Sequence, residues 1–219
     1  MCTNFVLKTT PSVDDLARLL GVDSALFQYS DNHKPGSVIS IVTGGNSDRM
    51  VHNALWWLYL KQTPEGLKPH PDYFSVNTNY RKLPQKTEFK THRCVVPVSA
   101  FAESQGGKRP HLLMPDDGSA MAFGGLWKEW TDQTTGEKLF SASVITLPGH
   151  PALEHIHRKS TPLWLPAEAI DMWLDPTFAN TAAFNELLTP ALRTPLRAIP
   201  IDKVWNKQPI GQPELIERN

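Results

Sequence analysis

The sequence contains only two cysteines, Cys2 and Cys94, among its 219 residues. So few cysteines exclude a scaffold built on several disulfides, and they fit a reducing compartment such as the cytoplasm. No apolar run approaches the length of about 18 residues that a membrane-spanning helix needs, so we expect no membrane contact. The N-terminus lacks a basic segment followed by an apolar core, so we also expect no secretory signal.

The chain also lacks an excess of charge of either sign, because 22 Lys and Arg residues balance 22 Asp and Glu residues. This balance excludes a strongly basic nucleic-acid coat but is compatible with a local basic groove. A chain of this length buries roughly 70% of its unfolded surface, so it needs no structural staple. We therefore expect one compact domain over residues 1–219, a monomer, with neither a cofactor nor a metal.

Proline is abundant, and the 19 prolines are spread along the whole chain. Helices must therefore be few and short, because an interior proline breaks them. The clearest helix follows Ser12, which we expect to be its N-cap, and Gly21 ends it. Its apolar stripe consists of Val13, Leu16, Leu19 and Leu20. Two further helices are expected over residues 167–174 and 181–188.

The rest of the sequence is typical of strands and turns. We expect strands over residues 38–42, 94–98, 121–130, 139–146 and 192–201. The first stops at the turn Gly44-Gly45-Asn46, and residues 132–136 form a hairpin loop between the third and the fourth. Residues 61–73 are rich in Pro, Gly and Lys and indicate a long loop, and a polar tail begins at about residue 203. The fold class is therefore α+β, with a mainly antiparallel, barrel-like β core and a few flanking helices.

Cys2 carries the most distinctive chemistry of the sequence. A small residue at position two normally permits removal of the initiator methionine, which would leave a cysteine with its own free α-amine. Such an amine titrates near pH 8 and a thiol at about 8.5, so both have reactive fractions at neutral pH. The thiol can attack a carbonyl with the amine as a local base. Alternatively, the amine can form a Schiff base with an aldehyde, which the thiol closes into a thiazolidine.

Other candidate catalytic residues are less specific. His155 and His157 lie on one face if this segment is extended, where one of them can act as acid or base, and with His150 or Cys2 they could also form a zinc site. Glu103 follows a small apolar run, as a carboxylate in a cleft would, although a solvated loop acid fits the same pattern. Cys94 lies within an apolar run and is expected to be a buried strand residue.

Two features suggest a nucleic-acid partner. Residues 79–93 hold the strongest basic cluster, which could line a phosphate groove or simply be a solvated loop. Trp56 and Trp57 are adjacent, so in a strand they point to opposite faces. At most one of them belongs fully to the core, and the other could stack on a base.

The order of these features resembles the SOS-response-associated peptidase (SRAP) family. The resemblance covers residue 2 to about residue 175. It rests on Met1-Cys2, Asn77, Arg93-Cys94-Val95-Val96-Pro97, Phe101-Ala102-Glu103, Ala122-Phe123-Gly124-Gly125-Leu126-Trp127, Val144-Ile145-Thr146, Ile156-His157 and Trp173-Leu174. It implies a single compact domain with a mainly β core and a protein that captures abasic sites in single-stranded DNA. In such a family the N-terminal cysteine reacts with the aldehyde of the ring-opened sugar to form a thiazolidine crosslink.

The resemblance also implies roles for individual residues. Cys2 matches the nucleophile, Asn77 the asparagine that positions cysteine and sugar, Glu103 the active-site carboxylate, and His157 the acid and base. Thr146 matches a threonine near the DNA backbone, and Trp56 or Trp57 matches a tryptophan region beside the unstacked strand.

The sequence departs from the family pattern at several positions. Thr3 and Asn4 stand where the family has Gly-Arg, and Asn79 stands where a second arginine is expected. Loss of two phosphate contacts should weaken DNA binding and flatten its salt dependence by roughly two charge units. Arg81, Lys82 and Lys159 can compensate from neighbouring positions. The proline after His157 comes one residue later than usual, as Pro162.

Two other functions fit the same residues. A cysteine-dependent amidase or peptidase could use Cys2, His157, and Asn77 or Glu103 as nucleophile, base and orienting group. A non-catalytic single-strand binder would instead use the basic cluster and the tryptophans. Whether the protein removes Met1 itself or a general aminopeptidase does so is left open by the sequence.

Overall fold

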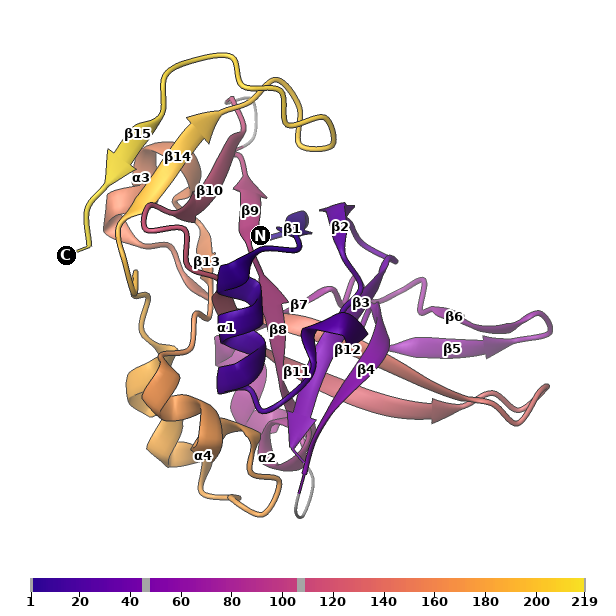
Figure 1. Cartoon of the computed structure of the whole chain (residues 1–219). Coiled ribbons are helices and arrows are strands. Elements are labelled where there is room, and N and C mark those ends of the chain that lie inside the picture. Colours follow the sequence, from indigo (N-terminus) through magenta and orange to yellow (C-terminus); the bar gives the residue numbers. More distant parts are fainter. Residues whose placement is uncertain (1, 45–47, 106–108, 219) are drawn as a thin grey trace.

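A computed structural model of the chain describes residues 2–44, 48–105 and 109–218. Figure 1 shows two sheets with helices packed around them and a pair of hairpins that projects to one side. The strands are β1 (Phe5–Leu7), β2 (Ser30–His33), β3 (Val38–Gly44), β4 (Arg49–Trp56), β5 (Leu60–Thr63), β6 (Gly66–Pro69), β7 (Asn77–Asn79), β8 (Arg93–Val98), β9 (Ala100–Glu103), β10 (His111–Pro115), β11 (Met121–Thr131), β12 (Lys138–Pro148), β13 (Ser160–Pro162), β14 (Leu196–Pro200) and β15 (Glu214–Ile216).

The helices are short, as the proline content predicts. The α-helices are α1 (Pro11–Leu19), α2 (Glu88–Thr91), α3 (Glu154–His157) and α4 (Ile170–Leu174). The 3₁₀ helices are η1 (Ser24–Leu26), η2 (Tyr80–Gln85), η3 (Pro151–Leu153), η4 (Ala167–Ala169) and η5 (Thr181–Leu188). The N-cap of α1 is Thr10 and not Ser12 as expected, because Pro11 occupies the first helical position and the Val13 N–H donates to Thr10 Oγ1. Gly21 follows the end of α1 with φ of 67°, as a C-terminal glycine should.

Five strands close into a barrel in the order β11-β8-β3-β4-β12, with β12 pairing back to β11. Most neighbours are antiparallel, but β12 runs parallel to β4 and to β7. Two glycines of β11 make the tight closure possible. A Cβ atom on Gly124 would lie 2.6 Å from Leu163 Cδ2, and one on Gly125 would lie 2.7 Å from the Ser143 carbonyl oxygen. The barrel-like α+β fold expected from the sequence is therefore confirmed.

A second sheet, in the order β15-β14-β10-β9-β1-β2, packs against the barrel. One core cluster joins the two, because it contains Phe5 and Phe101 from this sheet and Trp56 and Val144 from the barrel. A second cluster lies under α1 and α4 and covers the outer face of β3 and β8. Cys2, which precedes β1, is fully buried in the first cluster, so residues from both sheets surround the predicted nucleophile.

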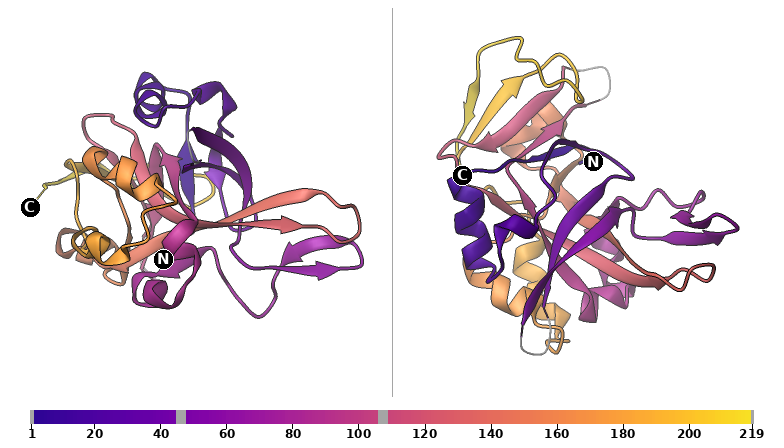
Figure 2. Two further views of the ribbon diagram at one scale, coloured as in Figure 1. Left: turned by 90° about the horizontal axis from the view of Figure 1, so that it is seen from below. Right: turned by 45° about the vertical axis from the view of Figure 1, so that its right-hand side comes forward.

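The segment expected to be a long loop, residues 61–73, is largely a hairpin made of β5 and β6. Gly66 makes its turn with φ of 103°, a conformation that favours glycine. The Asp132 carboxylate accepts a hydrogen bond from the Leu67 N–H at 3.0 Å and ties this hairpin to the turn between β11 and β12. Both views in Figure 2 show these two hairpins projecting together from the body.

The C-terminal region also differs from the expectation. The strand expected over residues 192–201 is limited to β14, and the polar tail after residue 203 contains β15, which pairs with β14. Ile216 of β15 is buried in the core that joins the two sheets. The other expected strands are present within a few residues. The expected turn Gly44-Gly45-Asn46 falls partly on residues 45–47, which lie outside the described residues.

Arg93 belongs to the core and not to an exposed basic cluster. Its guanidinium is buried and donates to the backbone carbonyls of Trp173, Phe89, Lys90, Asp175 and Phe178. Burial lowers the pKa of Arg93 to about 10, which leaves it charged at neutral pH. The arginine thus joins the end of β8 to α2, α4 and the segment that follows α4.

Candidate active site

Pairing between β1 and β9 brings Cys2 beside Glu103. Phe5 pairs with Phe101, and the Ala102 N–H donates to the Asn4 carbonyl at 2.9 Å. When this antiparallel register continues toward the N-terminus, Cys2 lies opposite the end of β9. The Cys2 side chain is fully buried, and its Sγ lies 3.9 Å from the Asn4 carbonyl oxygen.

Asn77 holds the backbone of the cysteine. It begins β7, which runs parallel to β12, and its Nδ2 donates to the Cys2 carbonyl oxygen at 2.7 Å. Within the described part of the chain, no donor reaches the buried Asn77 Oδ1. Asn77 therefore fixes the position of Cys2 and offers an acceptor at the same place.

Glu103 and His157 form an acid–base pair next to the cysteine. His157 Nδ1 donates to the Ser104 carbonyl at 2.8 Å and lies 3.5 Å from Glu103 Oε2. Because Nδ1 carries the proton, Nε2 is the acceptor of the ring, and it lies 3.4 Å from Ser160 Oγ. The alternative interpretation of Glu103 as a solvated loop acid is wrong, since only 4% of this residue is exposed.

Burial determines the protonation of all three groups. It raises the pKa of Glu103 to about 7, so the carboxyl is partly protonated at neutral pH. It lowers the pKa of His157, so the imidazole is neutral there. Burial, together with the charge of Glu103, raises the pKa of the Cys2 thiol, which is therefore protonated in this state. A nucleophilic reaction needs a base, and Glu103 and His157 are the bases at hand.

The two histidines near this site do not lie on an extended segment as expected. They belong to α3, where His157 is buried and faces Glu103, whereas His155 faces outward and lies 3.0 Å from Glu214. A zinc site made of His155 and His157 is not formed, because the helix points the two rings in different directions. Among the residues described, no group of three or more His, Cys, Asp and Glu side chains is placed to hold a metal.

A groove of about 530 Å³ adjoins the site, and we call it the Asn77 groove. Its wall includes Asn77, which contacts Cys2, and Ser160, which contacts His157. Five of the predicted DNA-binding or catalytic residues line it, from β7, η2, β12 and the segment before β13: Asn77, Asn79, Lys82, Thr146 and Lys159. Arg81 is exposed and lies outside the lining, with its Nε 3.2 Å from the Tyr80 hydroxyl.

The predicted tryptophan contacts need correction. Trp56 is fully buried, and its Nε1 donates to the Val76 carbonyl at 2.8 Å, so it packs in the core and presents no face to a base. Trp57 is half-buried and meets the edge of Phe74, with 5.0 Å between the ring centroids. Only one of the two adjacent tryptophans is therefore fully buried, as expected.

Exposed aromatic residues of the groove were missed by the sequence analysis. Tyr73 and Phe74 line the Asn77 groove and are 57% and 54% exposed. Tyr59 supports them, with its ring centroid 6.0 Å from that of Tyr73. We call Tyr73 and Phe74 the aromatic ledge. Two adjacent aromatic residues, four and three positions before Asn77, are the signal that could have identified it.

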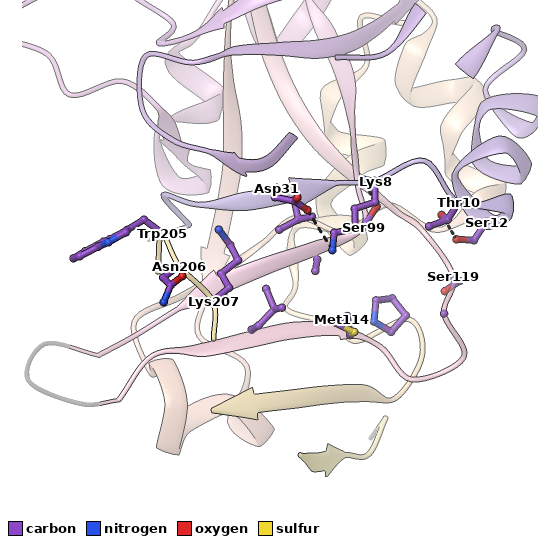
Figure 3. Close-up of a pocket in the computed structure, with 15 residues that line it drawn as sticks. Lys8, Thr10, Ser12, Asp31, Ser99, Met114, Ser119, Trp205, Asn206 and Lys207 are labelled. Atoms are coloured by element: carbon purple, nitrogen blue, oxygen red, sulfur yellow. Dashed lines mark hydrogen bonds and ion pairs between the residues drawn. The ribbon is translucent and has the colours of Figure 1, made fainter. Parts of the chain in front are cut away.

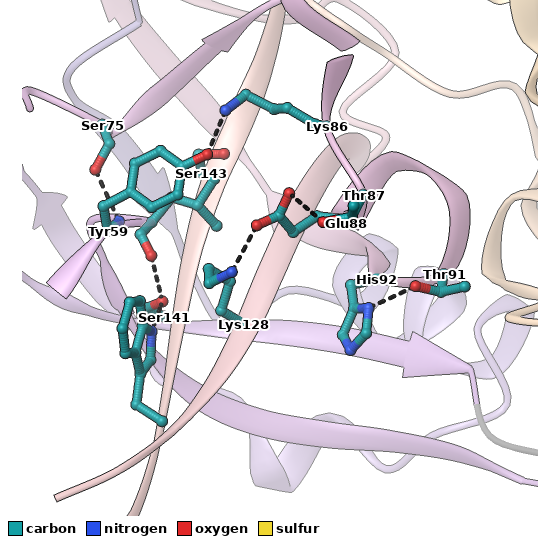
Figure 4. A network of polar contacts seen from close by, with 12 residues as sticks. Tyr59, Ser75, Lys86, Thr87, Glu88, Thr91, His92, Lys128, Ser141 and Ser143 are labelled. Carbon is teal, nitrogen blue, oxygen red and sulfur yellow. Dashed lines mark hydrogen bonds and ion pairs between the residues drawn. The ribbon is translucent and has the colours of Figure 1, made fainter. Parts of the chain in front are cut away.

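Lys86 belongs to the basic cluster expected over residues 79–93, and it is a further residue of the groove. Its Nζ donates to the Tyr59 hydroxyl and lies 4.7 Å from the ring centroid. Figure 4 shows this contact beside the ion pair of Lys128 with Glu88, whose Nζ and Oε1 are 2.6 Å apart. Three lysines, Lys82, Lys86 and Lys159, therefore line the Asn77 groove together with one acid, Asp72. The groove is locally basic although the chain as a whole is neutral.

The fold is an α+β barrel with a second sheet packed against it. Its candidate site consists of a buried cysteine, a buried carboxylate and a buried histidine. Residues 1–208 match the family model of the SOS response associated peptidase (SRAP). The chain therefore belongs to the SRAP family. A search of curated proteins found no match.

Several solved structures share the fold, including the following three. One, from Bacteroides thetaiotaomicron, has a TM-score of 0.74 and 19% identity, over 92% of this chain and 93% of that one. A second, from Bordetella bronchiseptica, has a TM-score of 0.71 and 16% identity, over 92% and 100% of the two chains. A phage-related protein from the same organism has a TM-score of 0.66 and 19% identity, over 95% and 100%. In the described part of the chain no helix is long and apolar enough to cross a membrane.

Proposed function

We propose that the protein captures abasic sites in single-stranded DNA through Cys2. The observation that carries this proposal is the position of Cys2, the second residue of the chain, which is buried next to Asn77, Glu103 and His157. The basic Asn77 groove leads to the same residues and suits a DNA strand. Removal of Met1 gives Cys2 the free amine that the reaction requires.

The chemistry consumes one aldehyde and releases one water. The Cys2 amine adds to the aldehyde of the ring-opened sugar, and loss of water gives a Schiff base. The thiol sulfur then bonds to the imine carbon, while the thiol proton moves to the nitrogen. The product is a thiazolidine that joins protein and DNA with no oxidant or reductant.

Each side chain next to Cys2 has a role in this reaction. Asn77 holds the Cys2 carbonyl, and its Oδ1 is an acceptor for a sugar hydroxyl. Glu103, with a pKa of about 7, can donate a proton to the departing water and accept one afterwards. Neutral His157 accepts a proton at Nε2 and assists ring opening of the sugar.

The family description suggests a peptidase as a second function, and the burial of Cys2 bears on its substrate. A thiol that is fully buried is out of reach of a folded polypeptide substrate. This favours a bond within the chain's own terminus, between Met1 and Cys2, over cleavage of other proteins. A non-catalytic single-strand binder would need the groove but not the buried Cys2, Glu103 and His157.

The test is a denaturing gel of the protein mixed with single-stranded DNA that carries one abasic site. We expect a shifted band with the wild-type protein and none with Cys2→Ala. Cys94→Ala is the matched control, because Cys94 is equally buried but lies in β8, far from the N-terminus in sequence. Intact mass must first establish that Cys2 is the first residue. A shifted band that persists in Cys2→Ala, or no band with the processed wild-type protein, would contradict the proposal.

A further inference from the structure

A second groove, of about 520 Å³, is lined in part by β1, and we call it the C-terminal groove. Val6 and Lys8 line it from β1 and the residue after it, and Leu112 and Met114 line it from β10. Trp205 and Lys207 close one end from the loop after β14. Figure 3 shows Trp205, Asn206 and Lys207 together at one end of the groove, and Thr10, Ser12 and Ser119 at the other.

A chain of polar contacts joins this groove to the residues around Cys2. Lys207 Nζ donates to Asn32 Oδ1 at 3.2 Å, and the same oxygen accepts from Asn4 Nδ2 at 2.6 Å. Asn4 is buried, and its carbonyl oxygen lies 3.9 Å from Cys2 Sγ. The cation of the C-terminal groove is therefore separated from the cysteine by only two asparagine residues. The Asn77 groove is linked to the same cysteine through Asn77, so side-chain contacts connect each groove to Cys2.

The loop that carries Trp205 is held in place rather than left free. The Asp202 carboxylate accepts from the Lys203 N–H at 2.6 Å, from Asn206 Nδ2 at 2.6 Å and from the Gln208 N–H at 3.0 Å. Trp205 is nevertheless 68% exposed, and Lys203 Nζ lies 5.7 Å from its ring. A large aromatic ring on a fixed loop is a surface suited to stacking.

The charges of the C-terminal groove favour an anionic ligand. Lys8 forms an ion pair with Asp31, with 3.2 Å between Nζ and Oδ1. Lys207 Nζ instead donates to the neutral amide oxygen of Asn32. The lining thus has two cations and one carboxylate, over an apolar floor. A single-stranded nucleic acid suits such a surface, because its phosphates can contact a lysine and its flat bases can stack on an aromatic ring.

We propose that the C-terminal groove binds the DNA strand on the side of the abasic site opposite the Asn77 groove, with a base on Trp205 and a phosphate at Lys207. This inference rests on the proposed function, because it continues the same strand past Cys2. From Cys2 to Lys8 the extended chain covers roughly 20 Å, so a flank of only a few nucleotides is needed to reach the groove.

The experiment measures fluorescence anisotropy of labelled DNA with Cys2→Ala protein, in which binding is separate from crosslinking. One oligonucleotide has flanks of about eight nucleotides on both sides of an abasic site, and two others each lack one flank. Trp205→Ala and Lys207→Gln are compared in this background. Lys90→Gln is the control, because Lys90 is exposed and lies in α2, outside the lining of both grooves.

We expect Trp205→Ala to bind the full oligonucleotide about 5- to 20-fold more weakly, within the range of one lost stacking contact. Lys207→Gln should also bind it more weakly, because one phosphate contact is lost. The same loss should occur with one of the two shortened oligonucleotides and not with the other, which identifies the strand polarity. Lys90→Gln should match the parent on all three. If Trp205→Ala and Lys207→Gln match the parent on all three, the groove does not bind the strand.

Crosslinking of the same full oligonucleotide by protein with intact Cys2 separates this inference from the proposed function. A crosslink with unaffected Trp205 and Lys207 variants overturns the groove and supports lesion capture. Flank-dependent losses in these variants without any crosslink support the groove and overturn lesion capture. Absence of binding to every oligonucleotide overturns both.

Discussion

Glu103 shows how one residue combines two opposing demands. Its position at the end of β9 brings the carboxyl next to Cys2 and His157, where a proton carrier is useful. The same position removes it from water and raises its pKa to about 7. Because the ordinary value is 4.5, the carboxyl titrates close to neutral pH only as long as the protein is folded.

This shift predicts a pH dependence of stability. Between about pH 4.5 and 7 the folded protein binds a proton that the unfolded chain has released, so the free energy of unfolding falls as the pH rises. Glu103→Gln lacks this proton. We therefore expect urea unfolding to show that the wild type loses about 2–3 kcal/mol more than Glu103→Gln between pH 5 and 8.

Glu186→Gln is a suitable control, because Glu186 is an exposed glutamate of η5, outside the site. Its pH dependence should follow that of the wild type. Equal losses for the wild type and Glu103→Gln would mean that the carboxyl is not displaced from its ordinary pKa.

At the scale of elements, the chain between β4 and β7 differs from the long loop that was expected over residues 61–73. The hairpin of β5 and β6 leaves the barrel and returns to it, and the chain then presents Tyr73 and Phe74 before it enters β7. The aromatic ledge therefore lies beside Asn77 because the returning chain must pass there. Trp56, which the sequence analysis offered together with Trp57 as a stacking residue, is fully buried and supports the barrel instead.

The aromatic ledge predicts a loss of DNA affinity without a loss of stability. Phe74→Ala or Tyr73→Ala removes one stacking surface, so we expect single-stranded DNA to bind roughly 5- to 100-fold more weakly. The melting temperature should change little, because both side chains are more than half exposed. Anisotropy titrations and thermal unfolding measure the two effects.

Leu26→Ala is the matched control for Tyr73→Ala, since Leu26 is also 57% exposed but lies in η1, away from the groove. It should leave DNA affinity unchanged. Wild-type affinity in both ledge variants would show that the bases do not stack there.

At the scale of the whole molecule, the arrangement of charge matters more than its total. The chain has no net charge, yet three lysines gather in one groove: Lys82 of η2, Lys86 directly after η2, and Lys159 before β13. None of them stands at the two positions, Asn4 and Asn79, where the family resemblance led us to expect arginine. Asn4 is instead buried, and its Nδ2 donates a hydrogen bond to Asn32. Its side chain is therefore not accessible to a phosphate.

These lysines predict the salt dependence of binding. Each phosphate contact contributes about 0.7 to the slope of log affinity against log salt concentration for a single strand. Replacement of all three lysines by glutamine should therefore flatten the slope by about 2. Titrations between low and moderate salt measure it, and Lys90→Gln should leave the slope as it is. A triple variant with the wild-type slope would place the phosphates elsewhere.

Local sequence patterns were sufficient for much of the fold. Hydrophobic runs predicted β3, β8, β11 and β12, and the turn residues between the last two predicted their hairpin. Such elements depend on side chains that are neighbours along the chain, which a sequence displays directly. The N-cap of α1, by contrast, was displaced by two residues because Pro11 fits the first helical turn better than the pattern around Ser12 suggested.

The sequence by itself determined that the chain is a neutral α+β protein with a cysteine at position two, and it identified Asn77, Glu103 and His157 as candidate partners of that cysteine. Only the tertiary structure decided which side chains share one environment. Burial of Glu103, the inward turn of His157 on α3, the core position of Trp56 and the exposure of Tyr73 and Phe74 all depend on contacts between strands that are distant in sequence. Those contacts arise from packing of the second sheet on the barrel, and the free energy of that packing is not encoded in any single segment.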